Sequence, residues 1–238
     1  PNWSYALPSG GQVVTNNGTI TAGSNVMDIT GSGNVVIDWN SFNIAANETV
    51  NFKNMQAVLN YVSGGSKSEI FGKLNGAGVN VFLVNPNGIL FGKTAQVNVG
   101  QLTASTRSLE KADLNSFSGS LSPLDAGGAA NVKADIINLG KLKAGKLVLE
   151  GNNLSIIDAE SLEVTDKSKI TLRAGENINI GYEVTDKTTI EVGDGKGNTH
   201  QVSDYGKGGG DKASDVLSAV SVTDLKGRTK SINDAMLV

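Results

Sequence analysis

The residues that could carry out acid–base chemistry in this chain are five carboxylates and three arginines. Enzymes that cleave acidic polysaccharides gather carboxylates on one face and hold the sugar with cations. The carboxylates are Glu150, Asp158, Glu160, Glu163 and Asp166, and the arginines are Arg107, Arg173 and Arg228. Because the carboxylates fall at differing places in an eight-residue rhythm of the chain, we interpret them as a solvated face and expect no catalytic residue.

Three further motifs suggest ligand binding, and each lacks a necessary part. Gly92-Lys93-Thr94 resembles the end of a phosphate-binding loop, but Asn87 stands where that loop needs glycine and no helix is predicted to follow. Residues 194–198 resemble the start of a calcium loop that lacks the later glycine and acid. His200 is the only histidine, and we interpret it as a solvated loop residue. We therefore expect no metal and no cofactor.

Charge and composition limit the classes of partner that this chain is expected to bind. The net charge is −3 and no run of Lys or Arg stands out, which disfavours nucleic acid and anionic membrane surfaces. No apolar run approaches the ~20 residues needed to span a bilayer, so membrane insertion is not expected. The chain has no cysteine and therefore no disulfide framework. It starts at Pro1 without Met or an apolar signal core, as expected for a mature or trimmed chain.

The elements that must position any functional residue are short strands joined by corners. Val79–Gly100 contains three β-prone pieces that begin at 81, 89 and 97, a spacing of eight. The tetrapeptide Asn85-Pro86-Asn87-Gly88 separates the first two pieces. Pro86 presets φ for the second position of a turn, and the two residues after it tolerate the bridge and left-handed regions. A chain that runs, corners sharply and runs again is being wound rather than folded into hairpins.

The rhythm is clearest between residues 147 and 180. Five apolar-x-apolar pieces begin at 147, 154, 162, 170 and 178, and alternation places their apolar side chains inward. Three such strands make a turn of about 23 residues, within the range of solenoid repeats. The length predicts about seven to nine turns. The 30 glycines and few aromatic residues suit many corners and a core of stacked Val, Ile and Leu. Asparagines at the corners are expected to pair along the rod.

Several segments depart from the rhythm. Trp3, Tyr5 and Leu7 suggest an edge strand or a cap, and Asn16-Asn17-Gly18 predicts a two-residue turn. Gln56–Val62 is compatible with helix or strand. Residues 106–130 are predicted to leave the main structure, with room for a small hairpin near Phe117.

These observations predict an all-β solenoid. Residues 1–192 are predicted to form the β-helix domain, including the excursion at about 106–130. Residues 193–238 form a less regular, Gly-rich C-terminal segment. Within it, 213–222 is open between helix and strand, and 228–238 between disorder and a strand that covers a sheet edge.

Four segments resemble the two-partner secretion domain found at the N-terminus of filamentous-haemagglutinin-like exoproteins. They are residues 6–11 (ALPSGG), 58–65 (VLNYVSGG), 81–92 (VFLVNPNGILFG) and 97–106. The resemblance covers roughly residues 5–180. Some members also carry an Asn-Pro-Asn-Leu motif upstream, where this chain has Asn51–Met55 instead. The chain is therefore more similar to the adhesin-like branch that lacks that motif, and no role of the motif is carried over.

The resemblance implies a right-handed parallel β-helix with an N-terminal cap and small extra-helical β elements. It implies export through the periplasm of a Gram-negative-type bacterium to the cell surface or beyond. The implied partner is a dedicated outer-membrane β-barrel transporter with periplasmic recognition domains. The domain would lead a longer adhesin, haemolysin or contact-dependent toxin, whose passenger meets the host or neighbouring-cell surface. We expect a monomer that serves as a non-catalytic export signal and folding nucleus.

The secretion motif implied by the resemblance consists of Asn85, Pro86, Asn87, Gly88 and Ile89. Two interpretations stay open: the motif builds a corner, or it contacts the transporter directly. Two other functions also stay open. The domain could be a surface carbohydrate-binding module, although its Trp and Tyr residues are scattered, or a β-helical polysaccharide-cleaving enzyme.

Overall fold

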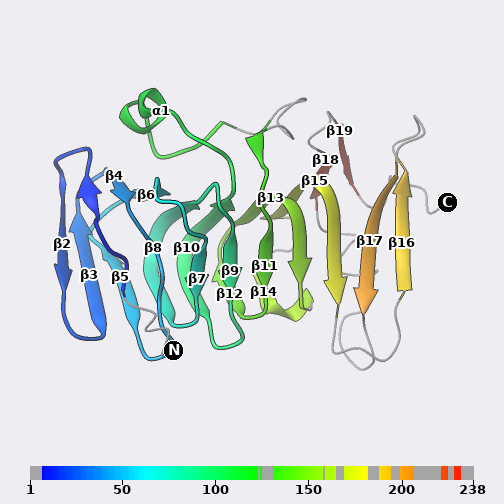
Figure 1. Ribbon diagram of the computed structural model, residues 1–238, viewed down its shortest axis with the longest axis horizontal. Helices are drawn as coiled ribbons and strands as arrows, with labels where there is room; N and C mark the ends of the chain where they lie inside the picture. The colour runs from blue at the N-terminus through cyan, green and yellow to red at the C-terminus, as the bar shows by residue number, and fades with distance from the viewer. Residues whose placement is uncertain are drawn as a thin grey trace.

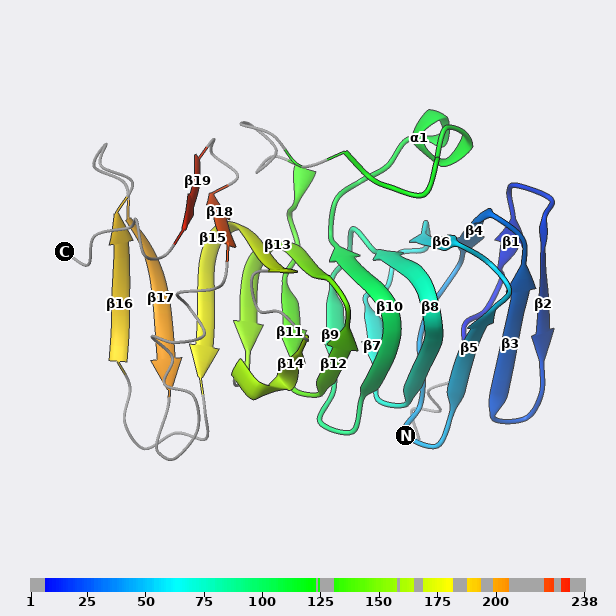
Figure 2. The same ribbon diagram turned by 180° about the vertical axis from the view of Figure 1, so that it is seen from behind.

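The strands of the chain wind into a parallel β-solenoid of about six turns (Figure 1 and Figure 2). The computed structural model describes residues 7–122, 124, 131–157, 159–164 and 169–181, and the strands at 188–193, 199–205, 221–224 and 228–231. The predicted all-β parallel coil is confirmed. The predicted seven to nine turns are too many, because the segment between Arg107 and Val132 leaves the winding without adding a turn.

The strands stack in three parallel columns. The first column contains β4 (Asn34–Trp39), β6 (Ala57–Val62), the second halves of β8 (Lys73–Val84) and β10 (Gln96–Ser105), the first halves of β13 (Leu147–Ile156) and β15 (Ile170–Gly181), and β18 (Ser221–Asp224). The second column contains β7 (Ser68–Ile70), β9 (Ile89–Phe91), β11 (Ile136–Asn138), the second halves of β13 and β15, and β17 (Thr199–Tyr205). The third contains β3 (Val26–Gly31), β5 (Thr49–Lys53), the first halves of β8 and β10, β12 (Lys141–Ala144) and β14 (Leu162–Glu163).

The predicted repeat appears directly in the pairing of β13 with β15. Glu150 lies opposite Arg173, 23 residues further along the chain. The pieces that begin at 147 and 154 form one bent strand, as do those at 170 and 178, with a register shift between Gly151 and Asn153. A bulge therefore replaces the turn that the eight-residue spacing suggested at this corner.

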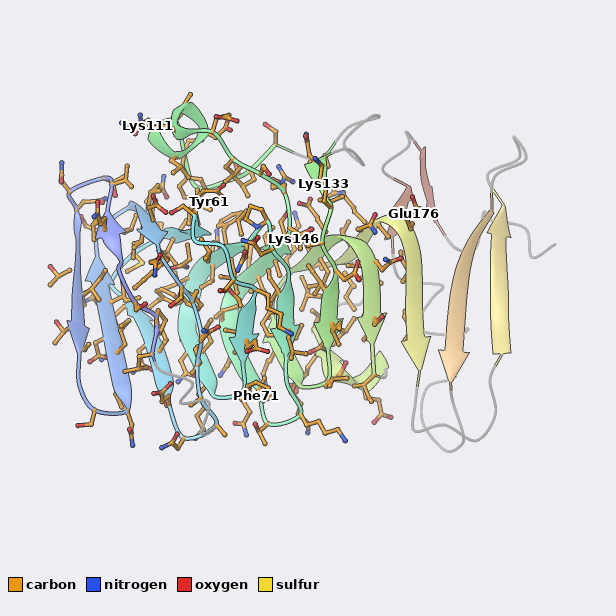
Figure 3. All side chains as sticks on the ribbon, in the orientation of Figure 1. Tyr61, Phe71, Lys111, Lys133, Lys146 and Glu176 are labelled. Atoms are coloured by element: carbon orange, nitrogen blue, oxygen red, sulfur yellow. The ribbon has the colours of Figure 1, made fainter. Side chains whose placement is uncertain are left out.

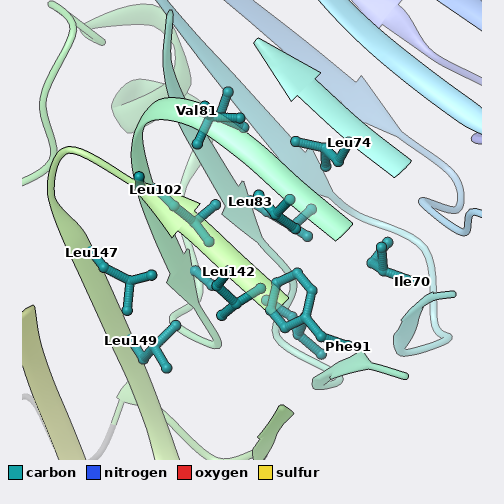
Figure 4. Close-up of a cluster of buried hydrophobic side chains, with 14 of the residues drawn as sticks. Ile70, Leu74, Val81, Leu83, Phe91, Leu102, Leu142, Leu147 and Leu149 are labelled. Atoms are coloured by element: carbon teal, nitrogen blue, oxygen red, sulfur yellow. The ribbon is translucent and has the colours of Figure 1, made fainter. Parts of the chain in front are cut away.

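The core fills the inside of the coil with aliphatic side chains. Leu149, Leu154 and Leu172 are fully buried, as the alternation predicted, and each contributes about 1.5–3 kcal/mol on burial. Figure 4 shows the same layering in the central turns, where Leu83 and Leu102 point into the coil. Stacked aliphatic side chains thus hold neighbouring turns together.

The N-terminal cap consists of two strands that pair antiparallel with the first turn. β1 (Gln12–Val13) lies along β4, and β2 (Gly18–Ala22) lies along β3. Asn16 between them has a left-handed φ of 56°. The two strands pair with different partners, so the predicted two-residue hairpin turn at Asn16-Asn17-Gly18 is wrong and the expected cap is confirmed. Residues 1–6, which include Trp3 and Tyr5, lie outside the described part of the chain.

Residues 107–122, which we call the flap, lie over the outer face of β4, β6 and β8 (Figure 1). The flap contains the short helix α1 (Lys111–Asn115), and none of its described residues forms a strand, so the predicted hairpin near Phe117 is wrong. Phe117 instead packs edge-on against Phe82, with ring centroids 5.2 Å apart.

The segment Gln56–Val62, which the sequence left open between helix and strand, forms strand β6, and both faces of this strand are buried.

Two further strands pair antiparallel at the C-terminal end. β16 (Thr188–Gly193) lies along β17, and β19 (Arg228–Ser231) lies along β18. His200 is part of β17, so its prediction as a loop residue is wrong. For residues 228–238, β19 agrees with the alternative of a strand that covers a sheet edge. For residues 213–222, which were open between helix and strand, residues 213–220 are not among those described. The domain boundary at residue 192 stays a prediction.

Candidate functional site: the corner at Asn85–Ile89

The Asn85–Ile89 corner joins β8 to β9 on the outside of the coil. The Gly88 amide donates to the Asn85 carbonyl oxygen at 3.1 Å, which closes a four-residue turn with Pro86 at its second position. Gly88 has φ +111°, a backbone conformation that disfavours any side chain. The predicted turn chemistry is therefore confirmed at Pro86 and Gly88.

The Asn85 side chain is fully buried and its polar atoms have protein partners. Its Nδ2 donates to the Ser66 carbonyl oxygen and to Ser68 Oγ, both at 3.0 Å. Its Oδ1 accepts from the Asn87 amide at 2.9 Å, which is the local side-chain bond of an Asx turn. This side chain ties the corner to the preceding turn of the coil and presents no surface to a partner in the folded state.

Asn87 is the exposed residue of the motif. Its Nδ2 donates to the Gly64 carbonyl oxygen at 2.7 Å. Backbone hydrogen bonds join the corner to the turns before and after it. The Ser68 amide donates to the Gly88 carbonyl oxygen, and the Ile89 amide donates to the Asp135 carbonyl oxygen. The corner is thus one layer of a stack, and only Asn87 and the half-buried Pro86 offer side-chain surface.

A hollow of about 390 Å³ opens beside the corner. Asn87, Gly88 and Asp135 line it together with Lys67 and Lys133, and Figure 3 marks Lys133. Leu90 and the 39% exposed Ile137 add apolar surface from β9 and β11. The surface that a partner would meet at this corner therefore combines amide, charged and aliphatic groups.

The phosphate-loop motif is a strand corner in the structure. The Gly92 amide donates to the Ile70 carbonyl oxygen, and Thr94 Oγ1 donates to that of Phe71 at 2.7 Å. Strand β10 follows, which agrees with the prediction that no helix follows this motif. The calcium-loop motif at 194–198 lies outside the described residues. Among those that are described, no three His, Cys, Asp or Glu side chains cluster to hold a metal ion, and no helix is long and apolar enough to span a membrane.

Glu150 contradicts the expectation of a solvated face. Its side chain is 1% exposed and lies between two arginines. Arg107 donates through both Nε and Nη2 to one carboxylate oxygen, and Arg173 donates through Nη1 to the other at 2.7 Å. The 23-residue repeat could have placed Arg173 beside Glu150. No sequence signal joins Arg107 to Glu150, because they are 43 residues apart with the flap between them.

The other carboxylates agree with a solvated face where they are described. Glu160 is exposed, and Glu163 pairs with Lys143 at 2.6 Å with both side chains more than half exposed. The hydrogen bond and charge of Lys143 lower the pKa of Glu163. Glu150 and Glu163 lie on different columns of the coil, so they do not form a pair. Asp158 and Asp166 fall outside the described residues, and Arg228 lies on β19.

Comparisons with known proteins agree with one another. A family model described as the TPS secretion domain matches residues 4–235. The Heme/hemopexin-binding protein of Haemophilus influenzae strain Rd is 34% identical over 181 residues, which are 72% of this chain and 19% of that protein. Another Heme/hemopexin-binding protein of Haemophilus influenzae is 44% identical over 91 residues, 37% of this chain and 10% of that protein. The chain thus spans about a fifth or less of these relatives.

A structural neighbour is the crystal structure of the HMW1 secretion domain from Haemophilus influenzae. It is 25% identical to this chain with a TM-score of 0.48, and the likeness covers 73% of this chain and 55% of that one.

Proposed function

Because the chain belongs to the TPS secretion domain family, we propose that it is the part of a large exoprotein that a dedicated outer-membrane transporter recognises and exports. The observation that carries the proposal is the family match over residues 4–235, with the Asn85–Ile89 corner inside a parallel coil. Export runs through the periplasm of a Gram-negative-type bacterium to the cell surface or the medium. The exoprotein's passenger, rather than this domain, meets other cells.

The domain acts as an export signal while it is still extended. An unfolded strand adds to an exposed sheet edge in the periplasmic part of the transporter through main-chain hydrogen bonds, and side-chain pockets add specificity. In the folded coil the described strands already pair mainly with strands of neighbouring turns, so most of their edges are no longer free to add to a sheet of the transporter. Recognition therefore precedes winding.

The domain then acts as a folding nucleus outside the cell. Each turn of a solenoid is stabilised by its neighbours, so the first turn needs a cover before others can be added. β1 and β2 supply that cover by pairing with the first-turn edges of β4 and β3. Winding outside the membrane opposes movement of the chain back through the pore.

Within the motif we assign two different roles. Asn85, Gly88 and Ile89 build the corner, since all three are buried in the stack. We assign the contact with the transporter to Pro86 and Asn87, because the folded coil buries their side chains least and so leaves them available for recognition of the extended chain. The motif therefore serves both interpretations that the sequence left open.

We propose further that the domain is neither a carbohydrate-binding module nor an enzyme. A sugar platform needs an exposed aromatic ring; of the Trp and Tyr side chains that the structure describes, Trp39 is 1% exposed and the half-buried Tyr61 belongs to the cluster covered by the flap. A polysaccharide-cleaving centre needs carboxylates gathered on one face, whereas Glu150 and Glu163 lie on different columns of the coil and both oxygens of Glu150 accept from arginine. A glycan-binding screen and a turnover assay on the purified chain are expected to be negative.

Deletion tests the proposal. Removal of residues 1–192 from the exoprotein, with the transporter present, is expected to abolish release into the medium while the passenger still accumulates inside the cell. Immunoblots of medium and cell fractions measure this. Release at the normal level would overturn the proposal.

A further inference from the structure

The flap covers an apolar strip on the outside of the coil. Outward side chains of a solenoid usually face water, but Val36, Leu59, Phe82 and Val84 are buried there. Leu114 and Phe117 of the flap pack against this strip. Figure 3 shows Tyr61 of β6 on the same side of the coil as Lys111 of the flap helix. The strip lies on β4, β6 and β8, so it is complete before the flap begins.

What holds the flap in place comes much later in the chain. The flap begins at Arg107, which forms an antiparallel bridge with Val132 where the chain returns. The Arg107 side chain is 8% exposed, and its Nη1 donates to the Ser122 carbonyl oxygen at 2.8 Å inside the flap. Its charge is balanced by Glu150, which lies 43 residues further on in β13.

The cluster is complete only when two later strands are in place. Glu150 sits opposite Ser105 in the strand pairing and opposite Arg173 on the other side. Arg173 shares the Glu150 carboxylate through its Nη1 at 2.7 Å. Three segments therefore meet at the Glu150 carboxylate: the start of the flap at Arg107, β13 and β15.

Charge determines when the flap can close. An arginine keeps its proton under all physiological conditions, so Arg107 cannot neutralise itself on burial. Burying a charge without its partner costs several kcal/mol, more than a surface pair returns. Before β13 is added, closing the flap over Arg107 would bury its charge without the Glu150 carboxylate that balances it.

We propose that the Arg107–Glu150–Arg173 cluster is a latch that delays closure of the flap until β13 and β15 have joined the coil. The apolar strip on β4, β6 and β8 stays open in the meantime. This inference deepens the proposed role of the domain as a folding nucleus. Only the idea that the delay in flap closure serves export rests on that proposed role.

Hydrogen exchange on the purified 238-residue chain tests the latch in the folded state. Glu150→Gln leaves both arginines without a counter-charge and is expected to raise exchange of the flap amides at 107–122 by about 100-fold or more. The amides of β6 and β8 should keep their protection. Glu163→Gln is the matched control, since it removes a carboxylate from an exposed pair with Lys143, and it should change neither region. Unchanged flap exchange in Glu150→Gln would overturn the latch.

Pulse-labelled refolding tests the order of events, first in the wild-type chain and then in a variant without the Arg107 charge. In the wild-type chain the flap amides are expected to gain protection after those of β8 and not before those of β13. In Arg107→Met the charge is gone while the stem remains, so flap protection should move earlier, to the time of β8. Flap protection that precedes β13 in the wild type, or an unchanged order in Arg107→Met, would contradict the proposal. Neither assay measures secretion, so failure of the latch and failure of the secretory role are separate results.

Discussion

Two asparagines two positions apart in the Asn85–Ile89 corner have different physical roles. Asn85 is buried and its amide holds three groups from two turns of the coil, whereas Asn87 is exposed and makes a bond to Gly64. The sequence predicted the turn because proline fixes φ and glycine permits a positive φ, and neither effect needs a neighbouring turn. It could not separate the two asparagines, since their difference comes from the neighbouring turn that covers Asn85.

Replacing each asparagine by alanine should therefore separate a loss of stability, expected mainly for Asn85→Ala, from a loss of secretion, expected for Asn87→Ala. Asn85→Ala removes three hydrogen bonds, to the Ser66 carbonyl oxygen, the buried Ser68 hydroxyl and the Asn87 amide, and should lower the free energy of unfolding by about 2–3 kcal/mol. Asn87→Ala should lower it by about 1 kcal/mol or less, yet reduce secretion by the transporter. Urea unfolding and immunoblots of the medium give the two values.

Asn98→Ala is the matched control, because Asn98 is an exposed strand asparagine away from the corner. It should change neither quantity. Normal secretion of Asn87→Ala would contradict the assignment of Asn87 to the transporter contact.

A second residue-scale effect concerns a polar ladder along the third column. Asn75 Nδ2 donates to Asn51 Oδ1 at 3.1 Å, and Asn51 Nδ2 donates to Asp28 Oδ1 at 2.8 Å. This pairing of asparagines lies on the outer face of strands and not at the corners where it was predicted; at the corners Asn138 donates to Ser161 and Asn153 donates to Asp135. The hydrogen bond from Lys53, followed by that from Asn51, lowers the pKa of Asp28 below 3.8.

Acid should weaken the fold through Asp28. Because the folded-state pKa of Asp28 is lowered, its contribution to stability is present above pH 3.8 and is lost as pH falls through the lowered value. Asp28→Asn should remove that part of the acid dependence, so the melting temperature of the variant falls less steeply below pH 3.8 than that of the wild type. Thermal melts across this range measure the difference. Parallel curves for the two chains would show that the ladder does not act in this way.

At the scale of elements, strands whose outward residues are polar were easier to predict than β6, which is buried on both faces. The pieces that begin at 154, 162 and 170 alternate cleanly because their outward residues Ser155, Glu163 and Thr171 are at least partly exposed, so the period of two survives in the sequence. In β6 the flap covers the outer face, and apolar residues on both sides hide the strand period. The sequence predicted that residues 106–130 leave the main structure, but it did not predict how the flap packs, since Leu114 and Phe117 find their partners far upstream in the chain.

Corners are a second element-scale feature, because each packs on the turn before it. Gly64 and Gly65 are adjacent, yet a Cβ on Gly64 would overlap the Asn40 carbonyl oxygen, whereas a Cβ on Gly65 meets nothing within 4 Å. Gly64→Ala should therefore destabilise the chain by about 1–3 kcal/mol, as the backbone must move. Gly65→Ala should stay within about 0.5 kcal/mol of the wild type. Urea unfolding followed by circular dichroism compares them, and equal midpoints would mean that the corner is not tightly stacked.

At the scale of the whole molecule, the coil follows from one repeated sequence pattern, an apolar pair followed by a corner. The features that depart from this pattern are set by long-range contacts. The cap pairs β1 and β2 with different strands, which the local turn signal at Asn16-Asn17-Gly18 could not reveal. The buried Glu150 depends on Arg107 across the flap. Family membership was readable from the chain because the corner motif lies in a context of further matching segments, and it is confirmed over residues 4–235.

The most direct measurement of the secretory role is export of a fusion. The 238-residue chain is joined to the front of a reporter that is not otherwise released, and the fusion is produced in a Gram-negative host with or without the cognate outer-membrane transporter. Reporter should appear in the medium only when the transporter is present. Reporter that stays in the cell despite a functional transporter, or that reaches the medium equally without it, would show that the domain is not the export signal.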